Sequence, residues 1–138
     1  MREKIVKNRK RLLSILLTAA LVLSLMPAVT LTAFAVTCGD FEVTGDTNYS
    51  YSDITGVLTF SGDGTYVVKL ASKWLAATDQ IVVSSGVVNI TLSDVIINAS
   101  GCAFTVASGA TVNLTLSGTN ALIGCGSGYD GLQVASGA

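Results

Sequence analysis

The sequence contains no histidine, and this absence excludes several kinds of active site. Catalytic triads in their usual form need an imidazole as the general base. Without histidine, the three scattered cysteines do not form a metal-ligand set. The Gly-x-Gly string in GCGSG lacks the strand-then-helix context of a nucleotide-binding loop. We therefore predict no triad, no metal centre and no dinucleotide or P-loop site.

Long hydrophobic runs are also missing, apart from one of intermediate length near the N-terminus. Six of the eight Lys and Arg residues lie within the first eleven positions, and a 14-residue apolar run, Leu12 to Leu25, follows them. Pro27, the sole proline, ends the run, and Ala33-Phe34-Ala35 has the small-x-small pattern that signal peptidase recognises. The run is too short for an uncleaved anchor, which needs about 20 residues. We predict that residues 1–35 are a secretory signal peptide, cleaved after Ala35.

Positive charge is scarce in the rest of the chain. Residues 36–138 contain two lysines, Lys69 and Lys73, no arginine and eight acids, a formal net charge of −6. Such a balance disfavours binding to nucleic acid or to anionic lipid. We predict an acidic, exported domain with no nucleic-acid partner, which meets a membrane only through its signal peptide during export.

Helix signals are absent from this part, and strand signals replace them. Residues 36–138 are rich in Gly, Ser, Thr and β-branched residues, with no amphipathic helical pattern of useful length. This composition is typical of an all-β domain with many turns. The regularly placed apolar residues provide too much apolar surface for a disordered linker.

A short phrase occurs twice in the chain: VNITLS at 88–93 and VNLTLS at 112–117. In both copies apolar and polar residues alternate, which is the period of a strand with one buried face. A second phrase precedes each copy and then occurs once more: IVVSSGV at 81–87, FTVASGA at 104–110 and LQVASGA at 132–138. A unit of about 20 to 30 residues cannot bury its own apolar face, so we expect the copies to stack.

Stacking in parallel would place equivalent residues about 4.8 Å apart. Ile90 would then lie on Leu114 inside the coil, while Asn89 on Asn113 and Thr91 on Thr115 would form polar ladders outside. We therefore favour an all-β, parallel β-solenoid. An antiparallel β-sandwich of short strands is the alternative.

The chain divides into a less regular and a more regular part. LTFSG at 58–62 echoes LTLSG at 114–118 and precedes an alternating strand at 65–70, which indicates an earlier, degenerate rung. We assign residues 36–79 to this rung and an N-terminal cap, with Ala71 to Gln80 as a connection or capping element. Residues 80–138 form the repeats, and the extra residues GCGSGYD are expected to project into solvent. Because LQVASGA ends where the earlier copies continue, we expect an N-terminal fragment of a longer protein.

These phrases, from GVLTFSGDGTY to GLQVASGA, resemble the repetitive β-helical segments of secreted and surface proteins of Gram-positive bacteria, often described as carbohydrate-binding or adhesin-like. The likeness covers residues 56–138. It implies a right-handed parallel β-helix, a secreted or cell-surface location, and a polysaccharide or a host or cell-wall surface as partner. It transfers no catalytic residue.

A polysaccharide-degrading enzyme is the alternative function, because parallel β-helices include such enzymes. Glycoside hydrolysis commonly needs two carboxylates across the sugar, but none of the eight acids recurs at the repeat spacing. Asp94 and Asp130 lie at corners, where Asp is favoured for turn chemistry, and Asp63 in SGDGT is interpreted in the same way. No acid cluster supports a calcium site. We predict a non-catalytic domain without a cofactor, either carbohydrate-binding or an adhesin-like stalk.

The candidate glycan-contacting surface combines the polar ladders with aromatic residues: Asn89, Thr91, Asn113, Thr115, Trp74 and Tyr129. Flat aromatic faces suit sugar rings, and Tyr49 and Tyr51 could supply further ones. The apolar neighbours of Trp74 in KWLAA favour the competing interpretation, a cap packed on the coil.

Two cysteines are candidates for a disulfide. Cys102 and Cys125 each follow a glycine and lie 23 residues apart, one repeat, so they could bond across adjacent rungs. Free thiols packed as small hydrophobes are an equal alternative.

Overall fold

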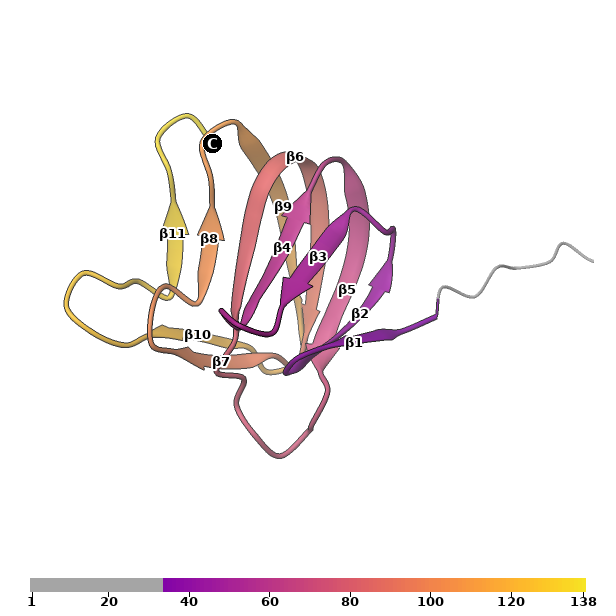
Figure 1. The fold of residues 1–138 in the computed structure, drawn as a ribbon, viewed down its shortest axis with the longest axis vertical. Coiled ribbons are helices and arrows are strands. Elements are labelled where there is room, and N and C mark those ends of the chain that lie inside the picture. The colour runs from indigo at the N-terminus through magenta and orange to yellow at the C-terminus, as the bar shows by residue number, and fades with distance from the viewer. Residues whose placement is uncertain (1–33) are drawn as a thin grey trace, which may run out of the picture. The chain divides into compact units, whose positions relative to one another are not determined.

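The computed structural model describes residues 34–138, which form a parallel β-solenoid of about three turns with no helix in this part of the chain (Figure 1). The all-β, parallel β-solenoid fold predicted from the sequence is confirmed. The strands are β1 (Val36–Cys38), β2 (Phe41–Gly45), β3 (Tyr49–Ser52), β4 (Val57–Ser61), β5 (Gly64–Leu70), β6 (Gln80–Ser93), β7 (Ile96–Ala99), β8 (Phe104–Val106), β9 (Ala110–Ser117), β10 (Ala121–Gly124) and β11 (Leu132–Val134). The predicted signal peptide, except for its last two residues, lies outside the described residues.

The coil has three sides, and each side is a parallel sheet. Strands β4, β8 and β11 stack with the first half of β6 on one side. Strands β5 and β9 flank the second half of β6 on another side, which we call the ladder sheet. Strands β7 and β10 form the third side. Since β6 passes through the Ser-Gly corner without a break, it belongs to two sides at once.

The register of the ladder sheet is the predicted one. Ile90 pairs with Leu114, Asn89 with Asn113 and Thr91 with Thr115. The inward residues of the first two turns are buried and form one core, against which Val112 and Leu114 of the last turn pack while only partly buried. The largest fully buried side chains are Tyr66, Phe41, Phe60, Phe104, Leu58, Ile81, Ile90, Leu92 and Ile97. The two-residue alternation therefore decides which side chains enter the core.

The predicted first turn of the coil is present, but LTFSG aligns with a different segment of the repeat from the one predicted. LTFSG lies in β4, which pairs with IVV at the start of β6, so Leu58 is level with Ile81. It is therefore equivalent to the Ser-Gly phrase, whereas its predicted counterpart LTLSG lies in β9 on another side of the coil. Similar patterns of apolar, Thr and Ser residues made the two strands hard to distinguish by sequence.

The third side was not predicted as a separate strand. It arises in the stretch after VNITLS, where Ile97 and Ala99 are buried and alternate with Ile96 and Asn98. Ala77 extends this side by a bridge to Ile97. The alternation in this stretch was a usable signal, but four residues are a short basis for assigning a strand.

The N-terminal strands cover one edge of the coil by antiparallel pairing. Strand β2 pairs with β5, and β3 pairs with β4, so that the edges of two sheets are occupied. Tyr49 packs there against Phe60 and Tyr66, with ring centroids 6.0 Å from each. At the opposite end of the described coil, Leu116 and Val134 are 60% and 58% exposed.

The loop between β5 and β6 corrects one interpretation. Trp74 is 92% exposed and Leu75 is 72% exposed, so these two side chains do not form a cap packed on the coil. Figure 1 shows the loop projecting away from the strands. Apolar neighbours in KWLAA suggested burial, but the loop carries Trp74 and Leu75 into solvent, and only Ala77 at its end returns to the core.

Within residues 34–138, the structure has no helix long and apolar enough to cross a membrane.

Candidate functional site: the ladder face and its groove

The outer side of the ladder sheet, here called the ladder face, presents polar residues in columns across the strands. The side chain of Asn113 donates a hydrogen bond from Nδ2 to Oδ1 of Asn89 at 2.9 Å. Asn89 in turn donates from Nδ2 to Oγ1 of Thr65 at 3.4 Å. Parallel in-register pairing places identical outward residues side by side, which is why the amides can bond in a row.

The neighbouring columns extend the same face. Val67, Thr91 and Thr115 form the second column, and Ser93 and Ser117 continue the third. Thr115 and both Asn residues of the first column are exposed, while Thr91 is half-buried. The face is therefore a surface of hydroxyl and amide groups that repeats at the strand spacing of about 4.8 Å.

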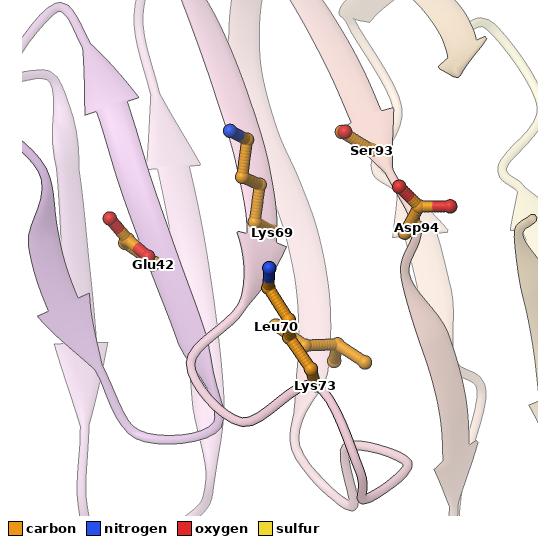
Figure 2. Close-up of a pocket in the computed structure, with 6 residues that line it drawn as sticks. All are labelled: Glu42, Lys69, Leu70, Lys73, Ser93 and Asp94. Atoms are coloured by element: carbon orange, nitrogen blue, oxygen red, sulfur yellow. The ribbon is translucent and has the colours of Figure 1, made fainter. Parts of the chain in front are cut away.

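A groove of about 460 Å³ lies at one end of this face. Its lining residues come from β2, β5, the loop after β5 and the end of β6: Glu42, Lys69, Leu70, Lys73, Ser93 and Asp94. Figure 2 shows the lysine side chains between Glu42 on one side and the pair Ser93 and Asp94 on the other. Glu42 is the direct cross-strand partner of Lys69.

The sequence did not reveal this groove as a site. It identifies Lys69 and Lys73 only as the two cations of residues 36–138, and Glu42 only as one of the acids. Glu42 meets Lys69 through the antiparallel pairing of β2 with β5, which no repeat or motif in residues 36–55 signals. The clearest available hint was that both lysines lie within five positions of each other.

Most acids that hydrogen-bond in the structure do so with main-chain N–H groups. Asp63 Oδ1 accepts from Val87 at 2.8 Å, and Asp94 Oδ1 accepts from Thr119 at 2.9 Å, each linking one turn of the coil to the next. Asp94 also has a φ of 54°, the left-handed conformation that Asp tolerates at corners. The turn roles predicted for Asp63 and Asp94 agree with these contacts.

Asp40 and Asp79 form a reciprocal arrangement that ties the N-terminal segment to the start of β6. Asp79 Oδ2 accepts from the Asp40 N–H at 2.9 Å and from the Tyr51 hydroxyl at 2.7 Å. Asp40 Oδ2 accepts from the Thr78 N–H at 2.7 Å. The hydrogen bond to the Asp79 carboxylate raises the pKa of Tyr51 to about 12, with smaller contributions from burial and nearby acids.

The aromatic candidates do not gather with the ladders. Tyr129 is 51% exposed on the loop between β10 and β11, which joins the two other sides of the coil. Tyr49 packs against the core and Tyr51 bonds to Asp79, so neither offers a free ring face. Trp74 is fully available to solvent, one residue beyond Lys73 of the groove. The structure thus unites Asn89, Thr91, Asn113 and Thr115 and separates Tyr129 from them.

Cys102 and Cys125 do not stack on each other, so of the two alternatives for these cysteines the structure has free thiols and no disulfide. Gly124 pairs with Ala99, which places Cys125 level with Ser100 rather than with Cys102. All three cysteines of the chain are free thiols, with Cys38 and Cys102 buried and Cys125 exposed. The Cys125 thiol donates to Asn98 Oδ1 at 2.9 Å. Offsets differ between the sides of the coil, so a spacing of one repeat did not imply vertical alignment.

Within residues 34–138, no group of three or more His, Cys, Asp or Glu side chains is arranged to hold a metal ion. The arrangement offers hydrogen-bond donors and acceptors on a regular surface, with charged groups at one end.

Comparisons with protein-family models, with curated proteins and with solved structures found no match.

Proposed function

We propose that this chain provides a non-catalytic, carbohydrate-binding domain on the surface of a Gram-positive bacterium or secreted from it. The observation that carries the proposal is the ladder face, where Thr65, Asn89 and Asn113 are bonded in a row and exposed. Amide and hydroxyl groups both donate and accept hydrogen bonds, as the hydroxyls of a sugar do. A regular array of them suits a polymer that repeats the same hydroxyl pattern.

The surroundings of the acids support a non-catalytic role. Asp40, Asp46, Asp63, Asp79 and Asp94 all accept hydrogen bonds from main-chain N–H groups. These contacts join turns of the coil or attach the N-terminal strands, which is sufficient reason for the acids to be there. A hydrolase would instead need two of them across a sugar-binding cleft.

Glycan-array binding by residues 36–138 tests the proposal. We expect binding to at least one polysaccharide class. An Asn89→Ala, Asn113→Ala double variant should lose roughly tenfold in affinity, because two to three hydrogen bonds of about 0.5 kcal/mol or more each are removed. Asn98→Ala is the matched control, since Asn98 is an exposed asparagine on the third side of the coil.

Two outcomes would contradict the proposal in different ways. Silence across neutral and acidic glycans would leave the adhesin-like stalk as the better assignment. Release of reducing ends or unsaturated sugars from a bound polysaccharide would indicate the alternative, a polysaccharide-degrading enzyme.

A further inference from the structure

The positive charge of the described domain is confined to one groove. Residues 36–138 contain two cations among eight acids, and both cations line the same groove. Lys69 lies on β5, whereas Lys73 lies on the loop that follows it, so different backbone elements bring them together. Both are exposed residues.

Part of this cluster has an ordinary structural explanation. Glu42 and Lys69 face each other across an antiparallel pair, and opposite charges in that position stabilise a sheet modestly. Lys73 is outside any strand, so cross-strand pairing does not account for it. With Lys73, the groove holds both cations of residues 36–138 alongside Glu42 and Asp94, so an anionic group of a ligand would find its positively charged partners here.

The groove is also continuous with the ladder face. Ser93 lines the groove and lies on β6 two positions after Thr91 and four after Asn89, on the same side of the strand. Four residues of strand span about 13 Å. A short oligosaccharide bound along the ladder face can therefore place one of its residues in the groove.

The following inference rests on the proposed function and concerns one sugar residue of a bound glycan. We infer that the groove is a subsite for a sugar that carries an anionic substituent, a carboxylate or a sulfate. Lys69 and Lys73 bind the anionic group, and Ser93, Glu42 and Asp94 accept hydrogen bonds from the hydroxyls of the same sugar. The groove volume, about 460 Å³, lies in the usual range for small-ligand sites.

The test compares glycans that share a backbone and differ in one acidic group. Oligogalacturonate against its methyl ester probes the carboxylate, and chondroitin sulfate against chondroitin probes the sulfate. Isothermal titration with residues 36–138 should show the more acidic member of at least one pair binding more tightly. Lys69→Gln and Lys73→Gln should each weaken binding of that member roughly three- to fivefold and binding of the other member less than about twofold, because an exposed charge pair contributes up to about 1 kcal/mol.

The Glu42→Gln variant should change the affinity for the acidic glycan in the opposite direction. Removing this carboxylate lowers the repulsion that an anionic group meets, so the acidic member should bind roughly twofold or more tightly. Asp130→Asn is the matched control, because it alters the net charge equally but lies on the corner before β11. It should change the affinity by less than about 1.5-fold, because physiological salt screens exposed charges that lie far from the ligand. Circular dichroism confirms that each variant keeps its fold.

The outcomes separate the two assignments. Equal binding of both members of every pair, or lysine variants that do not selectively weaken the acidic member, would overturn the groove assignment while leaving glycan binding intact. Binding to no glycan at all would overturn the proposed function, and the subsite with it.

Discussion

Gly86 and Gly109 occupy the same corner in successive Ser-Gly phrases, and both adopt left-handed φ values, 86° and 81°. Their surroundings differ. A Cβ at Gly86 would lie 2.5 Å from the Gly62 carbonyl carbon and 2.7 Å from the Asp63 nitrogen, whereas nothing lies within 4 Å of a Cβ at Gly109. Gly109 is needed for its left-handed conformation alone, whereas Gly86 is also needed because the preceding turn approaches it closely.

These two glycines allow conformational strain to be separated from steric overlap. We expect Gly109→Ala to lower the free energy of unfolding by about 1 kcal/mol, the cost of a left-handed conformation. Gly86→Ala should cost about 2 kcal/mol more, because main-chain atoms cannot move aside as a flexible side chain can. Urea denaturation of both variants measures the difference. Equal losses would show that the turn at Gly62 yields easily.

At the scale of elements, the N-terminal strands are attached through the Asp40 and Asp79 carboxylates as well as by strand pairing. Tyr51 on β3 reaches Asp79 just before β6, and Asp40 follows β1 and bonds to Thr78. These contacts join residues more than 25 positions apart, so they should form only when the coil is folded.

The Tyr51 hydrogen bond predicts an alkaline loss of stability. The pKa of Tyr51 is raised to about 12 in the folded chain, chiefly by Asp79, from about 10 in an unfolded chain. The unfolded state therefore releases its proton first, so the stabilisation is complete below about pH 10 and is lost as pH rises through about 12. Tyr51→Phe should cost about 1 to 2 kcal/mol near neutral pH and progressively less in that window.

Urea titrations of the natural chain and of Tyr51→Phe, from about pH 8 upward, measure this difference. Comparing the two is necessary because burial also raises the pKa of Tyr49 and Tyr66, which adds an alkaline loss common to both chains. If the difference in the free energy of unfolding between the two chains stayed constant with pH, it would contradict the hydrogen bond between Tyr51 and Asp79.

The register of β7 and β10 keeps Cys125 away from Cys102, so all three thiols should be free to react once they are accessible. Cys125 is exposed, whereas Cys38 and Cys102 are buried, and burial together with Asp53 raises the pKa of the Cys38 thiol and keeps it protonated. We expect iodoacetamide to modify one cysteine in the native protein and three in denaturant, without added reductant. Mass spectrometry counts the adducts. A single adduct in denaturant would show a disulfide and contradict the register.

At the scale of the whole molecule, stability should follow the position of each strand in the stack. Strand β6 is bonded to β4 and β5 on one edge and to β8 and β9 on the other. Strand β11 pairs only with β8 among the described strands, and all three of its residues are exposed. In a solenoid each turn is supported by its neighbours, so central strands open less often than terminal ones.

Hydrogen exchange measured by mass spectrometry should reveal this gradient. Peptides from 80–93 are expected to exchange most slowly, and peptides from 121–138 most quickly, by at least about tenfold. Rates for β2 and β3 should fall between these limits, because each strand pairs with one edge of the coil. Uniform rates across residues 36–138 would instead indicate a single cooperative opening.

Much of the fold followed from the alternation of residue types. Two copies of one phrase were enough to predict the register of β6 on β9 and the ladder of Asn89 and Asn113. A strand has a side-chain period of two and stacked turns a fixed spacing, so both can be deduced from local sequence. The exposed ladder residues of the candidate site could be predicted for the same reason.

The remaining features depend on contacts between distant segments. The equivalence of β4 with the start of β6, the separation of Cys102 from Cys125 and the exposure of Trp74 all turn on how loops of unequal length connect the turns. Glu42 meets Lys69 because an irregular N-terminal segment pairs with the edge of β5. Neither loop path nor edge pairing has a periodic signal, since each is selected by the fit of the assembled coil. The groove therefore emerged only in three dimensions.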